Sequence, residues 1–569
     1  MGRARGTFRT GEGVPWWAAP WPCDATWDRA FAGFWPHPVV RRFVPLAQEY
    51  GPSPSGCAYF TFDAPPGAVT AEIVDCDDGR RIPAETRMLG AGSRYFPDHV
   101  AAVSPVPGFV MREGVAHAVL LRADAAEPDP AMAALLAGAG PAPWRAAFAP
   151  LLSCGVPTSG VVAATVFTPA DQVRPGLDAA AAAMGHADAA DFSGPLVARP
   201  GPRGTGMVEG RWRAPQFRTG RARRVLSGGA PAAAPTEDEE VPFGLVLPPG
   251  PPPERGWPLL LSIHGGGCRY RDRLPEICGA AAPAGIAVAA QTLPYNPGRV
   301  HGGRTYGDIA YFNVFNPQAA VGLFFQAVVE QMLFLRLLTR AGAQQRWPLD
   351  PERMYVIGHS NGGTTAGVLL AVEPMLRGGV VAGFGGNIGA YVEDSEVIAG
   401  GMDPLWPALT GRRARAEPRS RFHPVVNLAH TAWGVWDTAN MAPRWILRPS
   451  AGVPPRHVYL AQGMHDEYAS VRNSTAVICA AGLDVAEPPA PTPEAAHAHQ
   501  VLRMRGRAHV DLPVRDNVES SAGGLRTGVA VEAVSLASGH EVCFEHREVL
   551  DQWVGAIASH ARGDGWVVR

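Results

Sequence analysis

The chain has 569 residues, which is more than one hydrophobic core usually fills, so its length predicts two domains. Its composition is 46% hydrophobic and 18% charged, with a formal net charge of −2 at pH 7, as is typical of globular proteins. The sequence has no basic stripe that would indicate nucleic acid binding, and no run of 18 apolar residues that would predict a transmembrane segment.

The first part of the chain is dominated by short β-type runs. After an irregular lead-in, residues 36–170 alternate such runs with Pro, Gly and Asp, a frequency of turn residues that predicts a β-sandwich-like module. Residues 195–206 are rich in Pro and Gly and mark the expected boundary. We therefore expect an N-terminal β-rich domain at 1–200 and a second domain at 201–569.

From Leu259 onward, apolar strands alternate with helical segments, which predicts an α/β domain with a mostly parallel central sheet. This pattern is interrupted at about 393–454, where aromatic residues are frequent and strand periodicity is lost. We expect an insertion that caps the site there, and a surface excursion packed on its own aromatics is the alternative. The predicted strands are 259–263, 286–290, 354–357, 380–384, 457–460 and 531–534, with a long helix around 321–338.

Residues 354–370 carry the strongest functional signal. A buried strand is followed by Gly358-His359-Ser360-Asn361-Gly362 and then by a small, apolar helix. In a strand–turn–helix context, G-x-S-x-G predicts a nucleophile elbow, whose turn is so tight that flanking side chains would collide. Ser360 is therefore the candidate nucleophile, with an ordinary Gly-rich turn and an idle serine as the alternative. His359, beside it, is expected to point away from the hydroxyl.

A serine hydroxyl needs an imidazole to accept its proton and a carboxylate to orient that imidazole. On a sheet of this kind the acid and then the histidine follow the serine, each just after a strand. Asp466 follows the strand at 457–460, and His540 follows the strand at 531–534, so we predict these two as acid and base. Either could instead be a structural loop residue; the alternative acids are Asp394, Asp437 and Glu467, and the alternative base is His546.

The tetrahedral intermediates of acyl transfer need backbone N–H donors for their negative oxygen. One donor should be Asn361, directly after the nucleophile, at a helix N-terminus. The others should be Gly266 or Gly267, because His264-Gly265-Gly266-Gly267 follows a buried strand and matches the oxyanion-loop motif of lipases and esterases.

The chain contains eight cysteines, an even number that permits disulfides. We expect some disulfide bonding, with Cys268 and Cys278 close in sequence and with Cys479 and Cys543 in segments that the fold should bring together. The sequence lacks the Cys/His spacings of zinc sites, so neither a metal nor a cofactor is expected.

On these motifs the segment 205–569 resembles the α/β-hydrolase superfamily, and the whole chain is similar to large bacterial lipases and esterases with an N-terminal β-domain. The resemblance implies a serine carboxylester hydrolase whose substrate is a small-molecule, lipid or polyester ester. A polyester depolymerase, a peptidase, an acyltransferase and a non-catalytic binding protein remain alternatives. The resemblance also implies a secreted or periplasmic protein, although the first residues lack a secretory signal, which leaves a cytoplasmic location open.

Overall fold

The computed structural model describes ten stretches of the chain, which are residues 3–9, 15–27, 35–201, 204–219, 229–299, 310–344, 347–410, 419–507, 509–535 and 538–569. The chain divides into two compact units. The first unit comprises Met1–Gln172 and Asn387–Gly434, and the second comprises Val173–Gly386 and Val435–Arg569.

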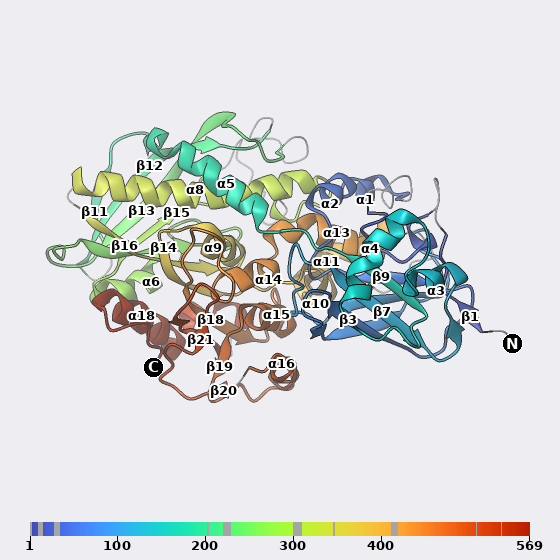
Figure 1. The fold of residues 1–569 in the computed structure, drawn as a ribbon. Helices are drawn as coiled ribbons and strands as arrows, with labels where there is room; N and C mark the ends of the chain where they lie inside the picture. Colours follow the sequence, from blue (N-terminus) through green and yellow to red (C-terminus); the bar gives the residue numbers. More distant parts are fainter. Residues whose placement is uncertain are drawn as a thin grey trace. The chain divides into compact units, whose positions relative to one another are not determined.

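The second unit is built on a sheet of twelve described strands (Figure 1). Its centre is parallel and runs in the order β15-β14-β16-β17-β18-β23, while β13 and β12 continue it antiparallel at one side. The bounds of these strands are β12 (Gly206–Gln216), β13 (Glu237–Leu247), β14 (Trp257–Ile263), β15 (Ala287–Gln291), β16 (Leu349–His359), β17 (Leu376–Ala382), β18 (His457–Met464) and β23 (Gly528–Val534). The edges are formed by β10 (Asp191–Phe192) and β11 (Val197–Pro200) on one side and by β19 (Asp484–Ala486) and β20 (His509–Val510) on the other.

Helices cover both faces of this sheet (Figure 1). One face packs against α6 (Leu274–Ala281), α17 (Val542–Glu545) and α18 (Arg547–Arg562), in a core that includes Leu260, Tyr355 and Trp553. The other face is covered by α5 (Arg174–Gly185), α8 (Pro317–Gln344) and α9 (Asn361–Val372). The central strands are buried on both sides, which is why their sequences are continuous apolar runs. The predicted α/β unit with a mostly parallel sheet is confirmed.

The first unit contains antiparallel sheets and several helices. The four-stranded sheet has the order β4-β3-β7-β9, and a three-stranded sheet has the order β2-β6-β5. One face of the four-stranded sheet is packed by α3 (Pro130–Leu136) and α4 (Ala142–Ser153), which contribute Leu135 and Phe148 to the core. The strands are β2 (Ala58–Thr61), β3 (Val69–Asp75), β4 (Arg81–Ile82), β5 (Ala84–Met88), β6 (Val100–Pro105), β7 (His117–Ala123) and β9 (Ala163–Phe167), and β1 (Ala4–Arg5) pairs with β8 (Ala126–Glu127).

The division into units differs from the predicted domain boundaries. Residues 173–200 belong to the second unit, because α5 packs there and β10 and β11 pair with β12. The predicted cap at 393–454 is split between the units at Gly434. Its first part contains α10 (Ile388–Asp394), α11 (Glu396–Met402), α12 (Trp406–Thr410) and α13 (Pro424–Trp433). Buried Arg421 ties this part to the first unit through Glu85 and the Ser104 hydroxyl.

The helix α8 (Pro317–Gln344) is both long and apolar. Its segment Pro317–Gly342 has a mean hydropathy of 1.6 in its most apolar window, and among the described helices it alone could cross a membrane by length and composition. However, 94% of that window is buried inside the protein, as expected for the core helix of a large sheet. We therefore assign α8 to the core.

The expected disulfides are not formed. Cys23, Cys57, Cys76, Cys154, Cys278, Cys479 and Cys543 are free thiols, so no two described cysteines are bridged. Most of these side chains are buried and act as small apolar groups: Cys278 and Cys543, for example, lie in the same core cluster as α6 and α18. Burial raises the pKa of the Cys479 thiol to about 12, so this side chain is not a reactive thiolate.

Candidate active site

Ser360 lies in a strained turn between β16 and α9. Its backbone has φ 57° and ψ −126°, which a non-glycine residue rarely adopts. The turn is closed by the Ser360 N–H, which donates to Ala382 O at 3.0 Å, and by the Gly363 N–H, which donates to Ser360 O at 2.8 Å. This is the strand–turn–helix geometry predicted from the motif.

The two flanking glycines are required by close contacts. A Cβ at Gly358 would lie 2.4 Å from both Gly362 O and Ala366 Cβ. A Cβ at Gly362 would lie 2.1 Å from Ile263 O, at the end of β14. Any larger residue would therefore displace the start of α9, and with it the serine.

Asp466 and His540 are in direct contact. The His540 Nδ1 lies 3.0 Å from Asp466 Oδ1 and 2.9 Å from Asp466 Oδ2. Since a carboxylate only accepts, Nδ1–H is the donor, and Nε2 of the neutral ring keeps its lone pair. Both residues are buried, with relative exposures of 8% and 7%. Asp466 Oδ1 also accepts from the Tyr468 and Ala469 N–H groups at 2.9 Å, so the carboxylate is itself held in place.

This contact arises because β18 and β23 are neighbouring parallel strands whose following loops meet. The register pairs Met464 with Val534, and the two candidate residues come shortly after these positions. The loops approach so closely that a Cβ at Gly539 would lie 2.1 Å from Met464 O and 2.7 Å from Asp466 N. Glycine at 539 is therefore a condition for the acid–base contact.

Ser360 follows β16 at the same edge of the sheet, and its neighbour His359 contacts the loop of His540. His359, the residue before the serine, donates from Nε2 to His540 O at 2.8 Å, and the two rings are 4.7 Å apart. Burial, together with the neighbouring His540, lowers the pKa of His359 to about 3, so the ring is neutral. His359 therefore links the elbow to the loop of the candidate base and does not act on substrate itself.

The glycine loop, residues 264–267, lies on the other side of Ser360. A Cβ at Gly265 would lie 2.9 Å from Ser360 Cβ and 3.4 Å from Ser360 Oγ, so the loop backbone passes next to the hydroxyl. His264 closes the loop, donating from Nδ1 to Gly265 O at 2.7 Å and accepting the Leu293 N–H at Nε2 at 2.9 Å. Burial lowers the pKa of His264 to about 4, consistent with this neutral tautomer.

The predicted oxyanion donors differ in their surroundings. Asn361 is the first residue of α9, so its N–H lies at the helix N-terminus beside the serine. The Gly267 N–H, in contrast, donates to Asn296 Oδ1 at 2.8 Å and is already engaged. Gly265, which motif matching did not select, also lies close to the serine: a Cβ there would be 3.4 Å from Ser360 Oγ.

The alternative acids and base lie in other environments. Asp437 caps α14 (Thr438–Met441) by accepting the Ala439 N–H, and Glu467 is exposed. Asp394 is part of the first unit. His546 precedes α18 and donates its backbone N–H to Val542 O. The structure therefore brings Asp466 and His540 together. Of the alternative acids in the second unit, Asp437 caps a helix and Glu467 is exposed.

Tyr468 is a site residue that sequence reasoning missed. Its ring lies over the imidazole of His540, with centroids 4.4 Å apart and planes tilted by 33°, and it is 40% exposed. His465, next to Asp466, has a positive φ of 60°, so the acid lies in a second strained turn. The only signal in the sequence was the proximity of Tyr468 to the candidate acid.

Among the described residues, no group of three or more His, Cys, Asp or Glu side chains is arranged to hold a metal ion. The candidate site combines a serine on a strained turn, a buried imidazole–carboxylate pair and a loop of glycine residues. This arrangement is suited to nucleophilic acyl transfer.

No family model matches the chain, and no curated protein matches it. Several solved structures resemble it. An acetyl xylan esterase from Paenibacillus sp. R4 is 15% identical, with a TM-score of 0.41 over 68% of this chain and 94% of the other. Acetyl xylan esterase 1 from Thermoanaerobacterium sp. JW/SL YS485 is 14% identical, with a TM-score of 0.36 over 63% and 87%. A carboxyl esterase from Bacillus coagulans is 14% identical, with a TM-score of 0.30 over 57% and 94%. All three are described as esterases, and at these values the likeness carries no conclusion about the activity or substrate of this chain.

Proposed function

We propose that this protein is a serine hydrolase that cleaves carboxylic esters through an acyl-enzyme, with Ser360 as nucleophile, His540 as general base and acid, and Asp466 as the orienting carboxylate. The observation that carries the proposal is the buried contact between His540 Nδ1 and both Asp466 oxygens. The strained turn of Ser360 supports it, because His359, the residue before the serine, is bonded to the backbone of His540. The order serine, acid, histidine along the chain fits the same mechanism.

In the acylation step, His540 Nε2 takes the Ser360 proton while Ser360 Oγ attacks the ester carbonyl. The imidazolium that forms is stabilised by the Asp466 carboxylate, which already accepts a hydrogen bond from the Nδ1–H group. The tetrahedral intermediate then collapses, the C–O bond to the alcohol breaks, and His540 gives its proton to the leaving alkoxide. In deacylation, water loses a proton to His540 and attacks the acyl carbon; the bond from that carbon to Ser360 Oγ then breaks, His540 returns the proton to Oγ, and the carboxylic acid is released.

The negative oxygen of each intermediate requires donors that are oriented before the reaction. We assign this role to the Asn361 N–H and to the glycine loop, with Gly266 as its donor. Removal of one such donor typically costs about 3–4 kcal/mol of transition-state stabilisation. Burial of Asp466 and His540 strengthens the attraction between the carboxylate and the imidazolium, because water competes less for both groups.

Ser360→Ala tests the proposal directly. The variant should lose hydrolysis of p-nitrophenyl acetate and butyrate and should no longer be labelled by a fluorophosphonate probe. A matched control is Ser474→Ala, which removes a buried hydroxyl that donates to Ser470 O and should leave both activities intact. Hydrolysis by Ser360→Ala at the parent rate would refute the mechanism.

The same assay addresses the alternatives. A peptidase would cleave an amide with the same acyl group at a rate comparable to the ester, and an acyltransferase would transfer the acyl group to an added alcohol in preference to water. A non-catalytic binding protein would react with neither ester nor probe. Release of soluble acids from a suspended polyester would identify a depolymerase.

A further inference from the structure

The glycine loop beside Ser360 is anchored by an asparagine from the next strand connection. The Gly267 N–H donates to Asn296 Oδ1 at 2.8 Å, although 29 residues separate the two in sequence. Asn296 lies in the connecting segment, residues 292–299, which follows β15, and β15 pairs in parallel with β14, the strand that leads into the glycine loop. The two connections therefore leave the same edge of the sheet and meet there.

Asn296 is itself fixed. Its side chain is fully buried, and its Nδ2 donates to Pro294 O at 3.0 Å. Its backbone N–H donates to Leu293 O at 3.3 Å, and its backbone O accepts the Arg299 N–H at 3.0 Å. Tyr295, the preceding residue, has a positive φ of 58°, so the segment is held in a strained conformation that its neighbours must stabilise.

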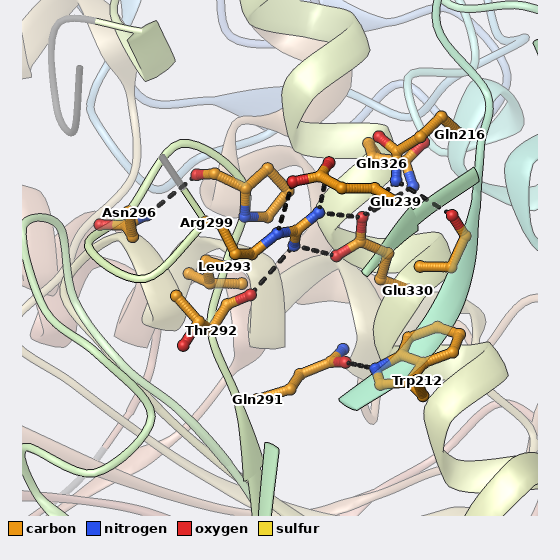
Figure 2. Close-up of polar contacts among 12 residues, drawn as sticks. Trp212, Gln216, Glu239, Gln291, Thr292, Leu293, Asn296, Arg299, Gln326 and Glu330 are labelled. Atoms are coloured by element: carbon orange, nitrogen blue, oxygen red, sulfur yellow. Dashed lines mark hydrogen bonds and ion pairs between the residues drawn. The ribbon is translucent and has the colours of Figure 1, made fainter. Parts of the chain in front are cut away.

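Arg299 supplies that stabilisation from the core of the second unit (Figure 2). Its guanidinium is fully buried between two carboxylates and donates from Nε and Nη2 to Glu239, and from Nη1 and Nη2 to Glu330. Nη1 also donates to Thr292 O at 3.0 Å, so all five N–H donors of the side chain are used. Glu239 belongs to β13 and Glu330 to α8, both central elements of the unit.

The charges in this cluster are matched by further donors. Glu330 Oε1 accepts hydrogen bonds from the side-chain amides of Gln216 at 3.0 Å and Gln326 at 2.9 Å, and these two donors help to stabilise its negative charge. Burial lowers the pKa of Arg299 and the Glu239 and Glu330 carboxylates raise it, and the net shift is upward, so the guanidinium stays charged. A fully satisfied buried network of this kind is rigid, because every alternative arrangement would leave a charge unpaired.

The anchor acts on the part of the loop nearest the nucleophile. His264 is bonded to Gly265 O and Leu293 N, and Gly267 is bonded to Asn296, so both ends of the loop are tied to the connecting segment. Between these ties, Gly265 lies against Ser360, and the Gly266 N–H makes no hydrogen bond to any described residue. Within the described part of the chain, the donor without a partner and the engaged donor are thus adjacent residues.

We infer that Asn296 is a positioning residue for the oxyanion loop: by holding the Gly267 N–H, it fixes the Gly266 N–H beside Ser360, and the Gly267 N–H is not itself an oxyanion donor. This inference rests on the proposed function. The opposite arrangement, in which Gly267 leaves Asn296 to bind the oxyanion, makes the opposite kinetic prediction, because removal of Asn296 would then release a donor.

The test is Asn296→Ala, assayed on a p-nitrophenyl ester and with a trifluoromethyl ketone inhibitor, whose adduct with a serine places an oxygen in the oxyanion site. A loosened loop should lower kcat by roughly 10- to 100-fold while KM changes little, since the loss falls on the transition state. The inhibition constant of the ketone should rise by a similar factor. A role in stability alone would lower the unfolding temperature without moving either quantity.

Asn517→Ala is the matched control. Asn517 Oδ1 accepts the Gly528 N–H at 2.9 Å, the same type of contact, at the start of β23 and so at the other end of that strand from His540. This variant should be destabilised but should keep its kcat. If Asn296→Ala does not fold, Asn296→Ser replaces it, because its hydroxyl is one bond shorter than the amide oxygen and the same kinetic loss is expected.

The outcomes separate the inference from the function on which it rests. If Ser360→Ala is inactive and Asn296→Ala keeps or raises both kcat and ketone affinity, the positioning role is wrong and the hydrolase mechanism stands. If Ser360→Ala retains activity, the proposed function fails whatever Asn296→Ala does. A loss of kcat and ketone affinity in Asn296→Ala, with Asn517→Ala unaffected, supports the inference.

Discussion

Among the described residues of the second unit, two buried imidazole–carboxylate pairs involve β23 or the loop after it. In one, His540 Nδ1 lies 2.9 Å from Asp466 Oδ2. In the other, His499 Nε2, from α16 (Pro493–Met504), lies 2.9 Å from Glu532 Oε1. By residue type, distance and burial the two pairs are nearly equivalent.

Their surroundings differ. The first pair lies at the carboxyl edge of the parallel strands, where His359 joins its loop to the elbow of Ser360. The second carboxylate lies within β23, and its other oxygen accepts the Ala490 N–H at 2.9 Å. The comparison teaches that an imidazole held by a carboxylate is a common structural element, and that it can act as a base only where the fold places a nucleophile beside it.

The largest difference should appear when each imidazole is removed. His540→Ala should lower kcat for a p-nitrophenyl ester on the order of 10⁶-fold, because the serine loses its base. His499→Ala should leave kcat within a few-fold but destabilise the protein by roughly 1–3 kcal/mol, because buried Glu532 loses a partner. Steady-state kinetics and urea unfolding of both variants measure these effects. Comparable kcat losses in the two variants would contradict the distinction between the pairs.

A smaller effect is expected from the carboxylates. Asp466→Asn should lower kcat by about 10⁴-fold, since an amide that donates to Nδ1 stabilises the wrong tautomer of His540. Glu532→Gln should not affect kcat, because its histidine takes no part in the reaction. The single-turnover rate of ester cleavage, compared at equal protein concentration, measures both. A Glu532→Gln variant as impaired as Asp466→Asn would show that the second pair also serves the site.

The third imidazole, His359, should show its role in the pH dependence of stability. Its pKa is lowered to about 3 by burial, His540 and Arg273, while Asp466 opposes the shift and Glu541 Oε2 lies 3.6 Å from its Nε2. The unfolded chain binds the His359 proton more tightly than the folded one. The contribution of His359 to the free energy of unfolding is therefore complete above pH about 6.5 and is lost as the pH falls toward 3. At pH 5, about 1.5 pH units below the unfolded pKa, the loss of unfolding free energy is about 2 kcal/mol, because each pH unit corresponds to about 1.36 kcal/mol.

His359→Gln removes this titration while keeping an N–H donor for His540 O. Its free energy of unfolding in urea should therefore fall less between pH 7.5 and pH 5 than that of the parent protein. Equal losses in the two proteins would show that His359 does not contribute to the acid sensitivity.

The elbow and the acid–base pair were predictable because each follows a strand that the sequence marks clearly. Parallel strands end at one edge, so residues that follow β16, β18 and β23 must gather there. Asn296 was not predictable in the same way, since its bond to Gly267 depends on the side-by-side placement of β14 and β15 and on the fixed position of Arg299. Tyr468 likewise became a site residue only through its ring contact with His540.

Errors of prediction arose where composition stood in for packing. The even number of cysteines favoured disulfide bonds. In the structure most of the thiols are buried as small apolar groups, and no described pair is bridged. The aromatic-rich stretch after residue 393 suggested one continuous insertion. Its first part belongs to the first unit, because Arg421 pairs there with Glu85, more than 300 residues earlier in the chain.

The sequence by itself determined the order of strands and helices, the strained serine turn and the residues that follow each strand, because apolar periodicity and glycine spacing are local properties. Only the tertiary structure decided which carboxylate holds His540, which glycine amide is engaged, and which carboxylates surround Arg299. These contacts join residues far apart in sequence, and their geometry depends on packing between strands and helices that local patterns do not encode.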